Sequence, residues 1–290
     1  MIWLVVTDFL RHPNSNDIIL MKKEEQPLRV KLVLGEARFK TVPVDYHHQL
    51  SSAIYRLFYN ADREFAAWLH SKGYGDKRRF KLFNFSQLFA RPGGYRVDLE
   101  HRKVTFTSDR VWFYISTPVD EIAMALAEAL TRSQNITLRL GRNVFALERA
   151  TAFATPMFED GVASLKCVSP VVLTRVNINE DGSYLPPAYI RPWDEDVEDY
   201  LKQNLINKYA AYTGKDLSRK ISVELDRTYV EKKKERCITS RYIKNEKIVG
   251  FKVPVKLFGP PEFLRFVYEV GLGVKNSLGF GMVERVGCFL

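Results

Sequence analysis

The stretch VTFTSDRVWFYISTPVDEIAMALAEALTRSQNITLRLGRNVFAL, from Val104 to Leu147, decides the fold. Its first part, Val104 to Ile115, is rich in β-branched and aromatic residues, which is typical of a strand. Its last part, Ile136 to Leu147, predicts a second strand. An apolar helix lies between them, so the stretch predicts a strand, a helix and a strand in succession.

The start of that helix is marked by its own residues. Thr117 suits the N-cap, and Pro118 suits the first helical position, where a missing N–H costs nothing. Ile122, Leu126 and Leu130 then form one apolar stripe that should face the core. A helix packed on a sheet is therefore expected.

Upstream of this stretch, a strand, two helices and another strand are predicted. Leu28 to Leu34 alternates apolar and polar residues like a strand, and Tyr46 to Tyr59 places its apolar residues on one helical face. A shorter helix should run from Ala61 to His70, and Phe80 to Leu88 predicts a strand. The complete order matches the split βαβ, or ferredoxin-like, arrangement, so residues 28–152 are predicted as one domain.

The second half of the chain can be interpreted in the same way. Its predicted elements are a strand at 165–176, a helix at 194–212, strands at 221–225 and 248–257, a helix at 261–270 and a strand at 282–288. With a boundary near residues 150–156, residues 153–290 form a second domain, into which a loop at 182–192 is inserted. The predicted fold class is α+β, with tandem ferredoxin-like domains.

The first residues stand apart from this scheme. Met21-Lys22-Lys23 resembles a translation start, and His12 to Asn16 has the composition of a turn. We therefore expect residues 1–27 to be an N-terminal extension that is poorly ordered and dispensable. The opening apolar run, Met1 to Val6, is too short for a signal peptide or a membrane span, so no membrane association is expected.

Composition favours a polyanionic partner and a reducing compartment. Lys and Arg number 44 against 34 Asp and Glu, giving a net charge of +10 and a pI near 9.4; such an excess favours nucleic acid without establishing it. Cys167, Cys237 and Cys288 are far apart and odd in number, so no zinc site or disulfide framework is indicated. The cytoplasm is the expected location.

The most specific pattern is a glycine segment near the C-terminus. It comprises Gly271, Gly273, Lys275, Asn276, Ser277, Gly279 and Gly281. Glycines permit a positive φ and a close approach of the backbone, so such a loop can hold phosphates through main-chain N–H groups and Lys275. A dinucleotide fingerprint does not fit, because the glycine spacing differs, a predicted helix precedes the segment and only nine residues of this sequence follow Gly281. A tight structural turn stays open as the alternative.

Tyr268-Glu269-Val270, the glycine segment and Met282-Val283 together resemble the signature of the CRISPR-associated endoribonucleases that cut repeat RNA. Val168 to Leu173 resembles the strand that opens the second domain of this family. Val42-Pro43, Ile54-Tyr55, Leu69-His70 and Lys81-Leu82-Phe83 resemble its N-terminal region in order and approximate spacing. The resemblance covers residues 29–288 and implies CRISPR repeat RNA as the partner.

The resemblance also implies a chemistry. RNA can be cut without a metal when its own 2′-OH attacks the neighbouring phosphorus, if one group accepts that proton, another protonates the 5′-oxygen and a cation steadies the phosphorane. By position, the Tyr-His-Lys set of the family falls on Tyr55, His70 and Lys81. The products would be a 2′,3′-cyclic phosphate (or 3′-phosphate) and a 5′-OH, with no metal or other cofactor.

Each of these residues also has a structural interpretation. Tyr55 could be an amphipathic core tyrosine, His70 a helix-end residue favoured by the dipole, and Lys81 part of a solvated basic run. Arg78 and Arg79 in that run are predicted to bind RNA phosphates, and Arg79 or Lys77 could replace Lys81 as the cation. Which of Tyr55 and His70 is the base stays open.

Other polar residues are assigned lesser roles. His47 and His48, at a helix start, are expected to be capping or surface residues. Further basic patches, at Lys232–Arg236 and Arg139–Arg142, are expected to be solvated faces. No spacing of His, Asp or Glu indicates a metal site.

The sequence thus predicts a metal-independent endoribonuclease that processes CRISPR precursor RNA, as a monomer or a homodimer. One alternative is a non-catalytic subunit that holds repeat RNA within an assembly of other CRISPR effector proteins. Another is a basic protein that binds structured RNA by shape. Metal-free cleavage of repeat RNA would distinguish the endoribonuclease from both alternatives.

Overall fold

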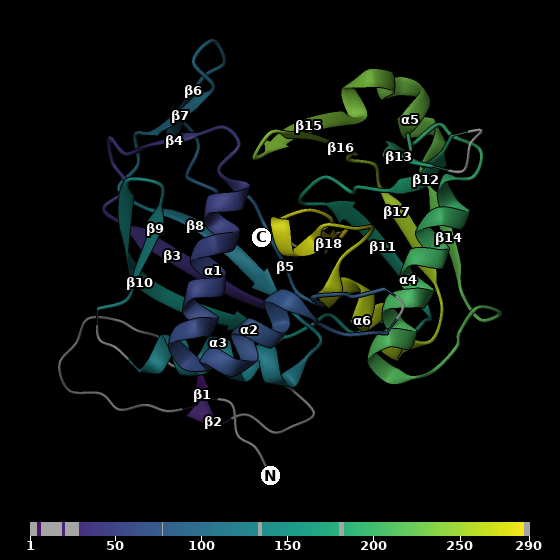
Figure 1. Cartoon of the computed structure of the whole chain (residues 1–290), viewed down its shortest axis with the longest axis horizontal. Coiled ribbons are helices and arrows are strands. Elements are labelled where there is room, and N and C mark those ends of the chain that lie inside the picture. The colour runs from purple at the N-terminus through teal and green to yellow at the C-terminus, as the bar shows by residue number, and fades with distance from the viewer. Residues whose placement is uncertain are drawn as a thin grey trace. The chain divides into compact units, whose positions relative to one another are not determined.

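The structure is a computed structural model that describes residues 5–6, 19–20, 29–76, 78–132, 135–179 and 183–286. It divides into two compact units (Figure 1). The N-terminal unit runs to Gly73 and continues from Lys81 to Thr155, and the C-terminal unit comprises Tyr74–Phe80 and Pro156–Leu290. The short segment Tyr74–Phe80 therefore belongs to the second unit although it lies within the first in sequence.

A five-stranded antiparallel sheet forms the centre of the N-terminal unit, with the strand order β5-β8-β3-β10-β9. The strands are β3 (Arg29–Gly35), β5 (Asn84–Phe85), β8 (Val111–Ser116), β9 (Thr137–Leu140) and β10 (Asn143–Phe153). The helices are α1 (His47–Ala61), α2 (Arg63–Ser71) and α3 (Asp120–Thr131). A small separate sheet contains β4 (Thr41–Pro43), β6 (Tyr95–Asp98) and β7 (Lys103–Phe106). Numbered along the chain, the four principal strands lie in the order second, third, first, fourth, which is the ferredoxin-like order.

Helices α1 and α3 lie side by side over one face of this sheet (Figure 1). Leu32 and Leu34 of β3 are fully buried, and so are Ile54 and Phe58 of α1 and Ile122 of α3. Burying such a side chain contributes about 1.5–3 kcal/mol relative to leaving it exposed. The apolar stripes predicted for both long helices therefore form the core.

The C-terminal unit repeats the same topology, with the strand order β14-β17-β11-β18. These strands are β11 (Val162–Cys167), β14 (Ser222–Leu225), β17 (Val255–Phe258) and β18 (Val283–Arg285). Its two long helices are α4 (Val197–Thr213) and α6 (Pro261–Val270). The remaining elements are β12 (Thr174–Ile178), β13 (Tyr184–Tyr189), α5 (Arg227–Lys233), η2 (Lys234–Cys237), β15 (Ile238–Ile243), β16 (Glu246–Phe251) and η3 (Asn276–Leu278). The tandem ferredoxin-like fold predicted from the sequence is confirmed.

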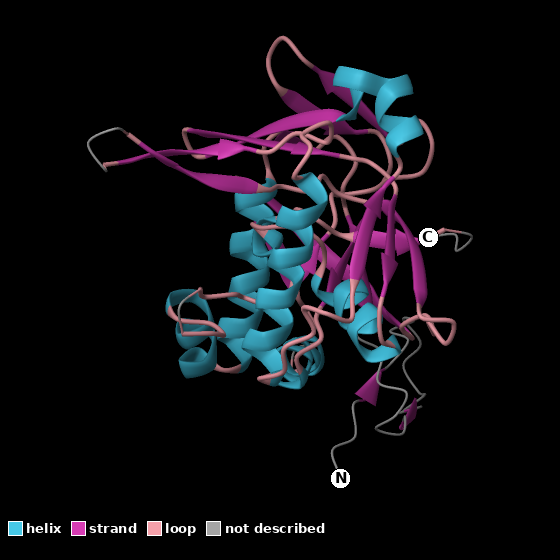
Figure 2. Ribbon diagram, turned by 90° about the vertical axis from the view of Figure 1, so that its right-hand side faces the viewer, coloured by secondary structure: helices cyan, strands magenta, loops and turns pink. Residues whose placement is uncertain are grey.

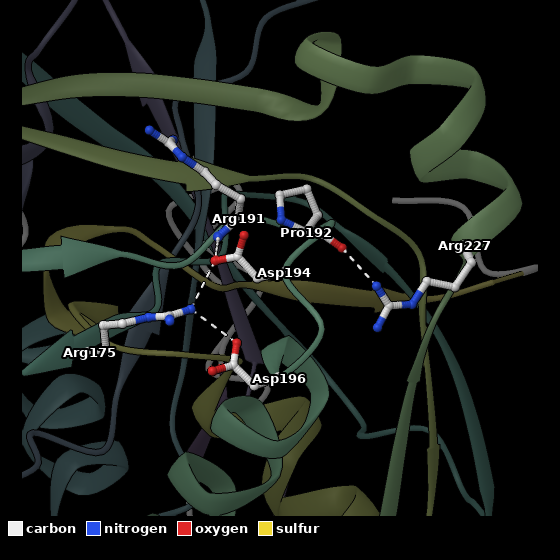
Figure 3. A network of polar contacts seen from close by, with 6 residues as sticks. All are labelled: Arg175, Arg191, Pro192, Asp194, Asp196 and Arg227. Carbon is white, nitrogen blue, oxygen red and sulfur yellow. Dashed lines mark hydrogen bonds and ion pairs between the residues drawn. The ribbon is translucent and has the colours of Figure 1, made fainter.

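Strands β12 and β13 form a long hairpin, seen at the left of Figure 2. An arginine on β12 ties it to the start of α4: the guanidinium of Arg175 donates to Asp194 and to Asp196, each at 3.0 Å (Figure 3). Arg227 reaches the same turn by donating to the Pro192 carbonyl at 3.3 Å. These contacts hold the chain between the hairpin and the helix in one conformation.

Several predicted strands of the N-terminal unit are divided by turns. Residues 104–115 form two strands, because the polar residues Ser108 and Asp109 turn the chain between β7 and β8. Residues 136–147 likewise contain a hairpin, since Gly141 has a φ of +60°. The predicted strand 80–88 is reduced to β5, and the φ of +48° at Leu82 lies just before it. The N-cap prediction for Thr117 was wrong, because α3 begins at Asp120 and its N-cap residue is Val119. The Thr117 hydroxyl donates to the Leu82 carbonyl and accepts from the Val119 amide, ahead of the helix.

The C-terminal unit shows the same kind of difference. The predicted strand 165–176 is broken between β11 and β12, where Pro170 cannot donate to a ladder. Pro254 similarly separates β16 from β17 within residues 248–257. The predicted loop 182–192 contains β13, because its tyrosines and leucine pair with β12.

Of the predicted extension, residues 1–27, the structure describes only β1 (Val5–Val6) and β2 (Ile19–Leu20), which pair antiparallel. The rest of this prediction lies outside the described residues. No helix within the described part of the chain combines the length and apolar character that crossing a bilayer requires.

Candidate active site and glycine segment

Tyr55 lies on α1 with one side of its ring against the core. Its ring meets Phe83 edge-on at a centroid distance of 5.5 Å and Phe58 at 6.1 Å. Phe58 and Phe83 are themselves fully buried and contact each other edge-on at 5.4 Å. Edge-to-face packing favours one ring orientation, so this aromatic pair fixes where Tyr55 points.

His70 lies in the last turn of α2 and is exposed. Its imidazole meets the Tyr55 ring edge-on at a centroid distance of 5.2 Å and an interplanar angle of 80°. Asp62 caps the start of α2 by accepting a hydrogen bond from the Phe65 amide at 2.9 Å, and Leu69 is fully buried. The helix therefore holds the exposed histidine against the tyrosine of α1.

Lys81 completes the group. Its Nζ donates a hydrogen bond of 2.7 Å to the main-chain carbonyl of His70. Carbonyls in a last helical turn lack intrahelical partners and attract cations, which explains why the lysine binds there. Three residues that are distant in sequence are thus brought together, as the resemblance implied, although their catalytic role stays a prediction.

The glycine segment follows α6 and is tightly packed in the C-terminal unit. A Cβ on Gly273, where φ is +66°, would lie 2.3 Å from the Val172 carbonyl oxygen. A Cβ on Gly281, where φ is +76°, would lie 1.9 Å from the Leu272 carbonyl oxygen. Neither position can accept a side chain without movement of the backbone, so these two glycines have the structural role that the sequence left as the alternative.

Asn276 is buried at the centre of the segment. Its Nδ2 donates to the Leu272 and Phe280 carbonyls, both at 2.9 Å. Its Oδ1 accepts from Nζ of Lys208 at 2.7 Å, and Lys208 also donates to the Gly271 carbonyl at 2.9 Å. The amide predicted to bind RNA is therefore committed to contacts within the loop.

The residues on either side of Asn276 are partly exposed. Lys275 has a φ of +63°, and its Nζ lies 3.4 Å from a carboxylate oxygen of Glu246. Ser277 is likewise half-buried. The Glu246 side chain is 59% exposed, and such an ion pair is worth about 0–1 kcal/mol, so a phosphate could replace the carboxylate.

The basic run before Lys81 forms a small hairpin of its own. The amide of Tyr74 donates to the Phe80 carbonyl and that of Phe80 to the Tyr74 carbonyl, both at 2.8 Å. Arg78 and Arg79 lie within it and are exposed. Both arginines belong to the C-terminal unit, and their exposed side chains could bind phosphates.

Of the two histidines at the start of α1, His47 differs from its predicted role. His47 is 3% exposed and stacks on Tyr46 at a centroid distance of 5.1 Å, so it is a core residue and not a surface one. His48 is half-buried, and its carbonyl accepts from the Ser52 hydroxyl at 2.9 Å. In the described part of the chain, no three His, Cys, Asp or Glu side chains are grouped so that they could hold a metal ion.

Sequence reasoning missed Lys208 and the packing of Phe58 and Phe83 against Tyr55. A signal for Lys208 existed: it follows Leu201 and Leu205 at helical spacing, on the stripe that packs into the core. A lysine at such a position needs a buried partner. Nothing local marked Phe83, because its contact with α1 is made only in the folded chain.

Known families match both units of this arrangement. The family model described as "CRISPR-associated protein Cas6, N-terminal" matches residues 41–151, and "CRISPR associated protein Cas6, C-terminal" matches residues 153–285. The chain belongs to the Cas6 family. The two matches meet within four residues of the boundary between the compact units at Thr155 and Pro156.

Curated Cas6 proteins align over most of the chain. A "CRISPR-associated endoribonuclease Cas6 1" from Methanocaldococcus jannaschii is 28% identical over 90% of this chain and 94% of its own length. A "CRISPR-associated endoribonuclease Cas6" from Pyrococcus furiosus is 29% identical over 88% of each chain. A solved structure titled "CRISPR associated protein Cas6" superposes with a TM-score of 0.68 and 27% identity, covering 90% of this chain and 100% of that one.

Proposed function

We propose that this Cas6 chain is an endoribonuclease that cuts CRISPR precursor RNA within its repeats. The observation that carries the proposal is the contact between the Tyr55 and His70 rings, 5.2 Å apart, with the Lys81 ammonium anchored 2.7 Å from the His70 carbonyl. Two groups that can exchange a proton and one fixed cation are what an internal attack on phosphorus requires. The M. jannaschii and P. furiosus relatives carry endoribonuclease names.

The reaction follows from that chemistry. The 2′-OH loses its proton to a base, its oxygen bonds to the adjacent phosphorus, and the bond from phosphorus to the 5′-oxygen breaks. An acid protonates the departing 5′-oxygen, which leaves a 2′,3′-cyclic phosphate and a 5′-OH. Tyr55 and His70 supply the base and the acid, and Lys81 stabilises the negative charge on the phosphorane. No metal ion or cofactor takes part in any step.

The RNA is held by groups outside this trio. The side chains of Lys275 and Ser277 contact phosphates or sugars, and so do Arg78 and Arg79. These are contacts that position the strand and carry little sequence information. The main-chain amides of Gly271, Gly279 and Gly281 donate to carbonyls within the protein, so these predicted RNA ligands shape the segment instead. The substrate is an intracellular transcript, so we place the activity in the cytoplasm, with the protein acting as a monomer or a homodimer and alone or beside other CRISPR proteins.

The test is cleavage of labelled CRISPR repeat RNA in EDTA by wild type, His70→Ala and His101→Ala. A positioned acid or base contributes roughly 10²–10⁴-fold. The cleavage rate of His70→Ala should therefore fall at least about 10²-fold below that of the wild type, while the two proteins bind the RNA equally tightly. His101 is exposed and pairs with Asp98 at 2.8 Å, which makes His101→Ala the matched control.

Two substrate changes complete the test. Replacing the 2′-OH at the break by hydrogen should abolish cleavage, because the nucleophile is removed. Replacing the 5′-oxygen by sulfur, a leaving group that needs no proton, should rescue His70→Ala if His70 is the acid and leave it inactive if His70 is the base. Binding by wild type without any cleavage would instead favour a subunit that only holds RNA.

A further inference from the structure

A lysine in the middle of α4 is almost completely buried. Lys208 is 1% exposed, one turn beyond the buried Leu205. Taking an ammonium out of water is costly unless its protons are bonded. The hydrogen-bond partners of Lys208 therefore indicate its role.

Lys208 donates two hydrogen bonds to the glycine segment. Nζ donates to the carbonyl of Gly271, the residue that ends α6, at 2.9 Å, and to Oδ1 of Asn276 at 2.7 Å. Asn276 in turn bonds the carbonyls of Leu272 and Phe280, which lie on the two arms of the loop. One side chain from a distant helix thus connects the entrance, the centre and both arms of the segment.

The position of Asn276 determines where its neighbours point. Lys275 precedes it with a left-handed φ of +63°, and η3 begins at Asn276 itself, so Ser277 follows in a fixed turn. We propose that Lys208 is a positioning residue for RNA binding: through Gly271 and Asn276 it holds the glycine segment so that Lys275 and Ser277 face the RNA. This inference rests on the proposed function.

Loss of the extra proton from Lys208 does not break these two contacts. Burial lowers the pKa of Lys208 to about 7. The neutral amine still carries two N–H groups, and the structure gives it two acceptors. Both contacts therefore persist on either side of neutrality, which suits a fixed element of a binding site.

Lys208→Met tests the inference, with Lys202→Met as the matched control. Methionine keeps the length of the side chain and removes both donors, while Lys202 lies on the same helix and is half-buried. Kd and KM for labelled CRISPR repeat RNA should rise about tenfold or more in Lys208→Met. The value of kcat at saturating RNA should change little, because Tyr55, His70 and Lys81 belong to the N-terminal unit. Lys202→Met should change Kd by about twofold at most, as expected for one surface charge.

Hydrogen exchange supplies a readout that is independent of cleavage. In Lys208→Met, amides of residues 271–281 should exchange faster while those of α6 and β17 stay protected. In the wild type, repeat RNA should slow exchange in that same segment. If repeat RNA leaves the exchange rates of residues 271–281 unchanged in the wild type, the inference is overturned even if Lys208→Met fails to fold. Equal affinities of Lys208→Met and Lys202→Met for repeat RNA would also overturn it.

The two proposals fail differently. A wild type that binds repeat RNA but does not cut it refutes the proposed function, whereas the affinity and exchange measurements still decide the role of Lys208. A wild type that cuts, with a Lys208→Met variant whose KM is unchanged, refutes only the positioning role.

Discussion

The packing of the glycine segment makes Gly281→Ala the most informative single change. The new Cβ would lie 1.9 Å from the Leu272 carbonyl oxygen and 2.6 Å from Nδ2 of Asn276. An ordinary contact begins at 3.4 Å, so the carbonyl would have to move by roughly 1.5 Å. That movement breaks the bond from Asn276 to Leu272 and the bond from the Leu272 amide to the Gly281 carbonyl, now 2.9 and 2.8 Å long.

The magnitude follows from a comparison with Gly214→Ala. Gly214 ends α4 with a φ of +71°, and no atom lies within 4 Å of the position of its Cβ. Alanine there costs only the left-handed strain, about 1–2 kcal/mol. Gly281 has nearly the same φ and therefore the same strain, and each broken buried hydrogen bond adds about 1–3 kcal/mol. With two such bonds broken, we expect Gly281→Ala to destabilise the C-terminal unit by about 2–6 kcal/mol more than Gly214→Ala.

The assay is hydrogen exchange at increasing urea concentration, followed in peptides from α6 and β18. These peptides report the free energy of opening of the C-terminal unit alone, which avoids assuming a two-state transition for a chain of two units. Binding of repeat RNA, measured in parallel, should weaken in Gly281→Ala and not in Gly214→Ala. Equal free energies for the two variants would refute the conclusion that the segment is closed around the Leu272 carbonyl.

Three further results are expected. Glu246→Gln should strengthen repeat RNA binding by a few fold, most clearly at low salt, because it releases Lys275 and removes a negative charge; unchanged affinity across a salt titration would place Lys275 away from the RNA. Tyr46→Phe should destabilise the N-terminal unit by about 1–3 kcal/mol in urea-dependent exchange, because the buried Leu88 amide loses its 2.7 Å partner; a cost as small as that of the exposed Tyr59→Phe would contradict this. Burial lowers the pKa of Lys208 from 10.5 to about 7, so between these pH values the unfolded chain binds a proton that the folded chain does not. The free energy of unfolding of the wild type should therefore rise relative to that of Lys208→Met as the pH increases from 7 to 10.5. A difference that stays constant over this range would show that Lys208 stays charged in the folded protein.

Local sequence determined the helices and the order of elements. The stripes on α1 and α3 and the bounds of α6 could be predicted because helical periodicity depends on neighbours three and four residues away. Turns were harder: Ser108-Asp109 and Gly141 divide apolar stretches that looked continuous, since a strand pattern does not reveal where the partner strand ends. The glycine segment was recognisable because the ability to adopt a positive φ is a property of glycine itself.

Only the tertiary structure decided what each candidate side chain contacts. Tyr55, His70 and Lys81 lie on separate segments, and their proximity results from the packing of α2 against α1 and from the hydrogen bond of Lys81 to the His70 carbonyl. Asn276 could not be recognised as an internal residue from sequence, because the partner that buries it, Lys208, is 68 residues away. The sequence by itself therefore determined which elements and which chemical groups are present. Folding decided which of those groups are buried together, because burial and hydrogen bonding depend on contacts between segments that are distant along the chain.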